Sequence, residues 1–448
     1  MAATTNLIAA KFGGTSTADA ERQRHVGRII EADPARRCIV VSAPGKRASK
    51  DDKITDMLKD LDEAWGEPRA RKIRKAIEER FVDIARGSRV KLDVKSRLKQ
   101  AFKTASALKG APRKHFLMSR GEWLNAQIVA KARGFTFVDA ADFMVFTNKG
   151  RFDMRRTMKR AERISLRERV CEGIVVPGFY GRKRRGGPIW TFSRGGSDVT
   201  GAIVAVLVGA DVYENWTDVE GVFEADPRIV PEAKKLDTIQ YDELRELGKM
   251  GSEVFHADAG AFVRKAGIPT HIRSTITPEK PGTLVVSDLP RKPGEVTGVA
   301  VKNGFAVITV EKYGLDDKIG ALTRFTRVFS KLGISIFHAP GSSDTMGVVI
   351  ESADFKKRRY EIIDKLERFF KPDHIRIEDE IALVCLVGIG MKHVPGIAGR
   401  FISNLGNNGV NIELIIQGTN EMSIIVGVKE SDRATAVRAT RKEFFGKK

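Results

Sequence analysis

The residues best suited to chemistry near the start of the sequence are a lysine and a pair of glycines. Residues 11–16 read KFGGTS and directly follow a predicted strand. Gly13 and Gly14 allow backbone N–H groups to approach an anion closely, and a following helix would add its positive N-terminal end. Lys11 could then neutralise a transferring phosphate. The spacing is not G-x-x-x-x-G-K-[ST], so the common NTPase loop is not predicted, and a purely structural turn is the alternative.

A second glycine turn, RGGSD, occupies residues 194–198 and opens a predicted helix of small side chains. Ser197 or Asp198 could simply cap that helix, which is the ordinary role of these residues at this place. Arg194 has no capping role. A guanidinium beside a glycine turn suits a bidentate grip on a carboxylate, so the turn is a candidate substrate site.

A polar loop at residues 216–228 follows a predicted strand at residues 211–215. Phe223 could supply an apolar wall for a base, and Arg228 a cation for a phosphate. Two glycine turns at strand ends together with this loop favour phosphoryl transfer, which depends on positioning and charge neutralisation. The seven histidines are scattered and suggest no Ser–His–Asp set, and His256 is interpreted as structural.

The elements that position these residues are alternating strands and helices in the first 290 residues. This alternation predicts a mainly parallel sheet covered by helices. The predicted strands are residues 7–11, 38–42, 136–139, 173–178, 211–215 and 270–273. The predicted helices are residues 18–31, 54–64, 71–86, 120–132, 154–170, 198–208 and 241–249. Residues 289–294, with two prolines and a glycine, read as a linker.

An internal repeat follows the linker. A shift of 76 residues aligns Gly320 with Gly396, Phe325 with Phe401, and Gly333 with Gly409. Each copy reads strand, helix, strand, strand, helix, and in the first copy residues 320–332 are predicted as an amphipathic helix and residues 334–337 as a strand. The sequence therefore predicts a duplicated βαββαβ unit.

The charge and composition narrow the classes of function. Of a net charge of +21, residues 66–120 contribute 17 Lys/Arg against 5 Asp/Glu, and residues 151–194 contribute 13 against 4. The first run is spaced like solvated helix faces, and residues 182–185 of the second are expected in a loop. Neither run is interleaved with aromatic residues, so we expect no specific nucleic-acid function. No apolar run is long enough for a membrane span, and residues 1–10 do not read as a secretion signal. Three widely spaced cysteines fit buried thiols in a reducing cytoplasm.

Four motifs carry a resemblance to a known family. Residues 11–16, 119–122 (SRGE), 194–198 and 217–222 (TDVEGV) occur in the order seen in aspartate kinases, and the 76-residue repeat is similar to that family's tandem ACT domains. The resemblance covers residues 7–428. It implies a three-layer α/β/α amino acid kinase fold at residues 1–288 and a linker and strand at 289–304 that pairs with the second ACT domain. Ferredoxin-like ACT domains would follow at 305–378 and 379–448.

The resemblance also implies an activity, the ATP-dependent phosphorylation of the L-aspartate side chain to 4-phospho-L-aspartate, the first step of lysine, threonine and methionine biosynthesis. Lys11 would contact the transferring group and Asp198 would orient Lys11. Arg194 would hold the α-carboxylate of aspartate and Glu122 its ammonium. The remaining implied contacts are Thr55, Phe179 and Ser197 for aspartate, and Gly13, Gly14, Ser42, Thr217, Asp218, Phe223, Asp226 and Arg228 for ATP.

No protein metal site is expected, because Mg²⁺ would enter with ATP and be held largely by phosphates and water. Glu253 stands where many members of the family have a nucleotide-contacting lysine. The resemblance further implies an unidentified amino-acid effector at the ACT domains and a homodimer or homotetramer formed through them. The alternatives are a glutamate or acetylglutamate kinase of the same fold, and a non-catalytic ACT regulator that binds amino acids.

Overall fold

The computed structural model describes residues 6–184, 186–193, 195–251, 254–315, 318–418 and 420–446. The chain forms two compact units. The first contains Met1–Val222, Lys235–Tyr241 and Val254–Leu289, and the second contains Phe223–Lys234, Asp242–Glu253 and Pro290–Lys448. Two short segments from the predicted kinase region thus belong to the second unit.

An eight-stranded sheet forms the centre of the first unit, in the order β3-β4-β2-β1-β7-β9-β10-β8. All neighbouring strands are parallel except β9 and β10. The strands are β1 (Ile8–Phe12), β2 (Arg36–Val41), β3 (Thr136–Phe137), β4 (Ile174–Pro177), β7 (Val212–Thr217), β8 (Thr238–Gln240), β9 (Thr270–Ser274) and β10 (Thr283–Val286). A separate hairpin joins β5 (Tyr180–Arg182) and β6 (Ile189–Thr191).

The register of the parallel strands brings their carboxyl ends to one edge. Phe12 at the end of β1 lies beside Val41 of β2 and Trp216 of β7, and Val41 lies beside Pro177 of β4. The loops after β1, β2, β4 and β7 therefore leave the sheet at the same edge, where open α/β sheets bind their ligands.

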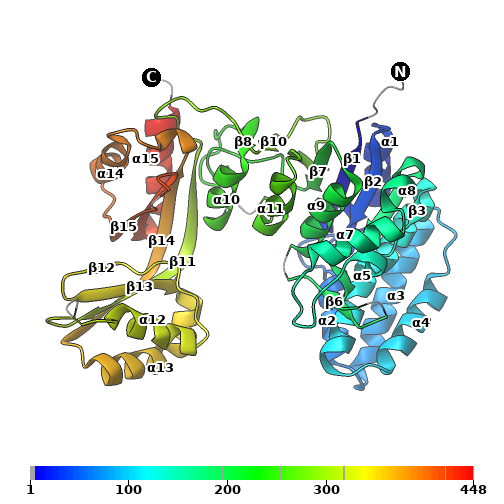
Figure 1. Ribbon diagram of the computed structural model, residues 1–448, viewed down its shortest axis with the longest axis horizontal. Helices are drawn as coiled ribbons and strands as arrows, with labels where there is room; N and C mark the ends of the chain where they lie inside the picture. Colours follow the sequence, from blue (N-terminus) through cyan, green and yellow to red (C-terminus); the bar gives the residue numbers. More distant parts are fainter. Residues whose placement is uncertain are drawn as a thin grey trace. The chain divides into compact units, whose positions relative to one another are not determined.

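Helices cover both faces of this sheet (Figure 1). On one face, α1 (Ala20–Glu31) and α5 (Gly110–Arg133) share a hydrophobic cluster with β1, β2 and β4. On the other face, α9 (Gly196–Val208) comes so close that a Cβ on its Gly201 would lie 3.0 Å from the Lys11 Cβ. The other helices of the unit are α2 (Ile54–Glu63), α3 (Arg69–Gly87), α4 (Val94–Ser106), α6 (Ala140–Phe143), α7 (Met154–Arg163), α8 (Leu166–Arg169) and α11 (Ala257–Lys265), while α10 (Tyr241–Lys249) starts in it.

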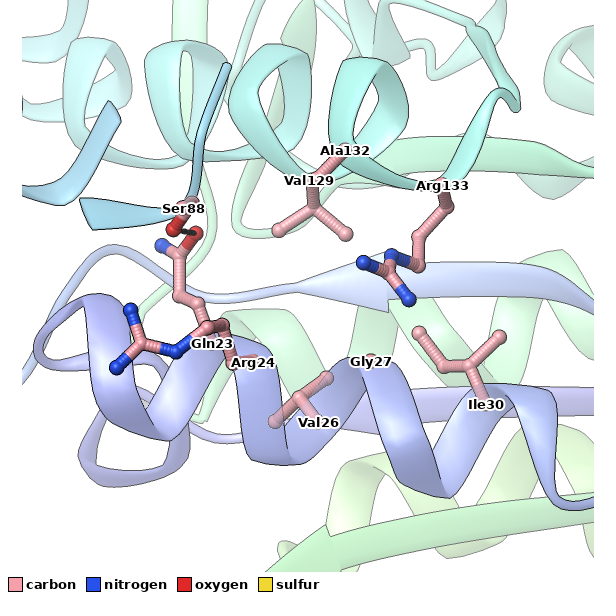
Figure 2. A pocket seen from close by; sticks show the side chains of 9 residues that line it. All are labelled: Gln23, Arg24, Val26, Gly27, Ile30, Ser88, Val129, Ala132 and Arg133. Carbon is pink, nitrogen blue, oxygen red and sulfur yellow. Dashed lines mark hydrogen bonds between the residues drawn. The ribbon is translucent and has the colours of Figure 1, made fainter. Parts of the chain in front are cut away.

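Figure 2 shows the close approach of α1 and α5 around Gly27. The guanidinium of Arg133 lies over Gly27, where a Cβ would stand 2.7 Å from its Nη1 atom, and pairs with Glu31. The small cleft there is thus filled by the protein's own side chain, and its role is packing.

A six-stranded antiparallel sheet forms the second unit, in the order β12-β13-β11-β14-β16-β15. Its strands are β11 (Gly298–Glu311), β12 (Gly341–Ser342), β13 (Thr345–Glu351), β14 (His374–Val387), β15 (Leu414–Gln417) and β16 (Ser423–Lys429). Its helices are α12 (Ala321–Lys331), α13 (Ser352–Phe370), α14 (Ile397–Asn407) and α15 (Arg433–Phe445).

The two long strands β11 and β14 run side by side through both copies of the repeat (Figure 1). The first five residues of β11 pair with Leu383–Val387 of the second copy, and its last seven pair with β13 of the first. Gly304 in β11 and Glu380 in β14 both have positive φ and mark the change from one copy to the other. These two positions are 76 residues apart, the same shift that relates the two copies, so the residue with positive φ is itself part of the repeat.

The predicted mixture of a mainly parallel α/β sheet and a duplicated repeat is confirmed, and most predicted elements are present. Four expectations need correction. Cys171, one of the three cysteines expected to be buried, is exposed, while Cys38 and Cys385 are buried. The helix predicted over residues 154–170 is broken by Ser165, which has a φ of 52° and separates α7 from α8. The strand predicted at residues 334–337 is absent. Ile334 and Ile336 do pack into the core, but backbone pairing with β13 starts only at Phe337. The helix predicted at residues 120–132 starts ten residues earlier, as α5.

Within the described ranges, no helix is both long enough and apolar enough to cross a membrane.

Candidate active site

Lys11 and Asp198 form an ion pair at the carboxyl edge of the first sheet. The Lys11 side chain leaves β1 and is only 7% exposed as a residue, and its Nζ lies 2.5 Å from Asp198 Oδ1. Helix α9 starts at the left-handed Gly195, and no side chain caps its first turn. The capping alternative for Ser197 and Asp198 is therefore not what the structure shows. Asp198 instead directs its carboxylate to the lysine.

The loops after β1 and β2 meet backbone to backbone. Gly45 N donates to Gly14 O at 2.8 Å, and a Cβ on Gly14 would stand 2.7 Å from Ala43 O. Glycine is required at this contact because any side chain would push the loops apart. Asn125 of α5 links the same two loops. Its Nδ2 donates to Ser42 O, after β2, at 2.6 Å and to Thr17 Oγ1, after β1, at 3.2 Å.

Arg80 anchors the loop after β2. This residue of α3 is buried, and its guanidinium donates to Asp52 O at 2.6 Å, to Gly45 O, and to Asp51 Oδ2 at 3.1 Å. Burial lowers the pKa of Arg80, an effect that Asp51 partly offsets. Arg80 therefore belongs to the support of the site, although the sequence had placed it on a solvated basic face.

Glu122 of α5 is a buried carboxyl group with spare bonding capacity. Desolvation raises its pKa to about 8, although hydrogen bonds from the Glu122 and Ala43 backbones and the charge of Arg120 act in the opposite direction. Its Oε2 atom is buried and has no hydrogen-bond partner among the described residues. Such an oxygen is suited to an incoming cation, because a cation would both pair with it and favour its ionised form.

The start of α2 lies next to Glu122. A Cβ on the adjoining Gly121 would stand 2.7 Å from Ala43 Cβ and 3.1 Å from Ile54 Cγ2. Ile54 N donates to Pro44 O at 3.1 Å, which fixes the first turn of α2, and Thr55 lies in that turn. The structure thus brings the neighbourhoods of Thr55 and Glu122 together.

Phe179, in the loop after β4, and Ser197, in the first turn of α9, come together. A Cβ on Gly178 would stand 2.6 Å from Ser197 Oγ, and a Cβ on Gly196 would stand 2.7 Å from Phe179 Cδ2. Phe179 has a φ of 78°, and its N–H donates to Thr200 Oγ1 at 3.0 Å. The loop after β4 is thus fixed against the first turn of α9. Arg194 lies outside the described residues.

The residues predicted for the nucleotide divide between the two units. Thr217 ends β7 in the first unit and Asp218 follows it. Thr217 Oγ1 lies 3.2 Å from Asp218 Oδ1, and Thr275 N donates to Thr217 O at 2.8 Å. Phe223, Asp226 and Arg228 belong to the second unit.

In that unit Phe223 packs against the hydrophobic cluster of the second repeat. Arg228 pairs with Asp226 at 2.7 Å, and its hydrogen bonds lower the pKa of that carboxyl group. Glu253 lies outside the described residues. The nucleotide role of Phe223, Asp226 and Arg228 stays a prediction.

Three supporting residues carry no motif and were missed in the sequence: Arg80, Asn125 and Asn215. Arg80 lies within a charge run that resembles a solvated face. Asn125 and Asn215 stand among apolar residues of a predicted helix and strand. A polar residue in an otherwise buried segment is the one signal that could have marked them. The ring of His256 lies against Gly195, and its interpretation as a structural residue stays a prediction.

No three Asp, Glu, His or Cys side chains converge in a metal-binding arrangement within the described part of the chain.

Comparisons with known proteins agree with this geometry. The amino acid kinase family matches residues 6–274, and an ACT domain matches residues 384–444. Aspartokinase 3 of Bacillus subtilis is 33% identical over 97% of this chain and 98% of its own length. The chain belongs to the aspartokinase family. An aspartokinase of Mycolicibacterium smegmatis is 32% identical over 98% of this chain and 96% of its own.

A solved structure supports the same membership. The crystal structure of Clostridium acetobutylicum aspartate kinase, described as an allosteric enzyme, has a TM-score of 0.91 and 38% sequence identity. It covers 98% of this chain and 100% of its own. The predicted aspartate kinase architecture with C-terminal ACT domains is therefore confirmed.

The support of the loop after β2 can be tested through Arg80. We expect Arg80→Leu to free residues 43–53 and to raise the KM values of both substrates several-fold, because Gly45 and the start of α2 lose their anchor. The carbonyl oxygens of Gly45 and Asp52 lose their donor, so unfolding should also require about 1–3 kcal/mol less free energy. Steady-state kinetics with urea unfolding measures both effects. Arg86→Leu, an exposed arginine of the same helix, is the matched control. Equal behaviour of the two variants would contradict the role of Arg80.

Proposed function

We propose that this chain transfers the γ-phosphoryl group of ATP to the side-chain carboxylate of L-aspartate, which yields 4-phospho-L-aspartate and ADP. The observation that carries the proposal is the ion pair between buried Lys11 and partly buried Asp198, which lies at the carboxyl edge of the sheet beside the Gly13 turn. A carboxylate oxygen of aspartate attacks the γ-phosphorus while the bond to the ADP oxygen breaks. The reference pKa of that carboxyl is about 4, so it is already ionised at neutral pH and needs no general base.

Phosphoryl transfer depends chiefly on charge neutralisation and positioning. Lys11 is proposed to neutralise the transferring group, with Asp198 setting the direction of its ammonium. The backbone N–H groups near Gly13 and Gly14 are proposed to hold phosphate oxygens. The close packing of Gly14 on Ala43 and Gly45 supports this role, because it keeps the turn rigid and free of side chains.

The aspartate pocket is proposed to lie between α5, α2 and the start of α9. Glu122 would bind the substrate ammonium through its unpaired oxygen. Phe179 and Ser197, which the structure brings together, and Thr55 would complete the pocket. Arg194, by its place in the sequence, would bind the α-carboxylate, the bidentate partner to which a guanidinium is best suited.

The nucleotide is proposed to contact Ser42, Thr217 and Asp218, with Phe223, Asp226 and Arg228 contributing from the adjoining loop. Mg²⁺ would be held chiefly by the triphosphate and water, as is usual for this ion.

The second unit is proposed to bind a regulatory amino acid through its two ACT repeats, residues 305–378 and 379–448. The linker and strand at residues 289–304 precede these repeats in the sequence. We also propose that the enzyme is a cytoplasmic homodimer or homotetramer. Five large apolar side chains of the first repeat are at least half exposed and would suit an interface between copies: Tyr313, Ile319, Leu322, Tyr360 and Phe369.

The activity is tested by ADP release with L-aspartate in parallel with glutamate, acetylglutamate and UMP. We expect turnover with aspartate at millimolar concentration and little with the other acceptors. Lysine, threonine and methionine are then added singly, and at least one should change the rate. Absence of aspartate-dependent turnover would refute the assignment. If no amino acid affects the rate, the repeats serve assembly and not sensing.

The pKa of Glu122 predicts a pH dependence of aspartate binding. Because the free carboxyl titrates near 8, it is mostly protonated at pH 7, and the substrate ammonium favours its ionised form. The KM for aspartate should fall by up to about tenfold for each pH unit as the pH rises toward 8, and should become constant above pH 8. The KM for ATP should not follow this course. Glu122→Gln should raise the KM for aspartate and abolish its pH dependence; a flat profile in the unsubstituted enzyme would contradict the role.

A further inference from the structure

A buried asparagine bridges both members of the catalytic pair. Asn215 of β7 is 1% exposed and lies directly opposite Lys11 in the register of β1 and β7. Its Oδ1 accepts a hydrogen bond from Lys11 Nζ at 3.3 Å. Its Nδ2 donates to Asp198 Oδ1 at 3.5 Å. One side chain therefore contacts the cation and the anion together.

An amide is chemically suited to this position. It has an acceptor for the ammonium and a donor for the carboxylate, and it adds no charge to the pair. A leucine would remove both contacts. An ionised aspartate would add a second negative charge beside Lys11 and would compete with a phosphoryl group for the same ammonium.

Among the described residues, the partners of Lys11 leave one of its three N–H bonds available. Asp198 and Asn215 account for two of them. The Gly13 turn lies close by, since a Cβ on Gly13 would stand 3.6 Å from Lys11 Nζ. The proposed phosphate-binding turn and the free N–H of Lys11 are thus neighbours.

We propose that Asn215 is a positioning residue for phosphoryl transfer: it holds the Lys11 ammonium and the Asp198 carboxylate in one arrangement, with the remaining N–H of Lys11 available to the transferring group. This inference rests on the aspartate kinase activity proposed above. It goes beyond the family motifs, because Asn215 lies in the strand before the 217–222 motif and belongs to none of them.

The test compares Asn215→Leu and Asn215→Asp with a control, Ile272→Ala. Ile272 is the buried β9 neighbour that pairs with Asn215 in register, so its truncation weakens the same part of the sheet without touching Lys11 or Asp198. Each variant is assayed for kcat, for both KM values and for Tm.

We expect Asn215→Leu to lower kcat about 10- to 100-fold while both KM values stay within about twofold, because misplacing a reacting group affects the transition state more than ground-state binding. Ile272→Ala should lower Tm and leave kcat within about twofold of the unsubstituted enzyme.

Asn215→Asp adds a readout that packing alone would not produce. When the new carboxyl is protonated, it is neutral like the amide, and when it is ionised, it competes for Lys11. Its kcat relative to the unsubstituted enzyme should therefore fall as pH rises from 6 to 9.

The outcomes separate the role of Asn215 from the activity itself. An unsubstituted enzyme that does not use aspartate refutes the proposed function. An active enzyme whose Asn215→Leu variant keeps its kcat, or loses no more than Ile272→Ala, refutes only the role of Asn215. If Asn215→Leu does not fold, the pH profile of Asn215→Asp decides, and a constant ratio to the unsubstituted enzyme overturns the proposal.

Discussion

The ion pair between Lys11 and Asp198 is the interaction on which the site depends. A nearly buried ammonium is costly without a close counter-charge, so the end of β1, the first turn of α9 and the middle of β7 must meet at one point. Glycine makes the meeting possible: a Cβ on Gly201 would stand 2.5 Å from the Tyr213 hydroxyl and 3.0 Å from Lys11 Cβ. The parallel sheet then brings the loops after β1, β2 and β4 to the same edge.

The second unit includes part of the loop that follows β7. Ala225, Val230 and Ala233 belong to the hydrophobic cluster of the second repeat. Arg441 of α15 donates to Glu224 at 3.1 Å, and Val299 N of β11 donates to Glu224 O at 2.7 Å. The segment that carries Phe223, Asp226 and Arg228 is therefore fixed to the core of the second repeat.

Much of this arrangement could be predicted from the sequence, because glycine turns, strand alternation and a gap-free repeat are local patterns. The pairing of Lys11 with Asp198 came from the family resemblance and not from spacing, since 187 positions separate them. The supports could not be predicted. Arg80 looks like any residue of a basic helix, and its burial depends on a loop far away in sequence. Similarly, residues 334–337 alternate like a strand because Ile334 and Ile336 pack into the core. An alternating pattern does not fix the residue at which backbone pairing begins.

A double-mutant cycle on Lys11 and Asp198 tests the central claim most directly. Lys11→Met and Asp198→Asn, alone and together, are compared by kcat for aspartate-dependent ADP release. Lys11→Met should lose about 10²- to 10³-fold, as expected for one preorganised donor. If Asp198 acts by orienting Lys11, the double variant should lie within about threefold of Lys11→Met, because no ammonium remains to be oriented. If the fold-losses in kcat of the two single variants multiply in the double variant, the two residues act independently, and this result would contradict the account.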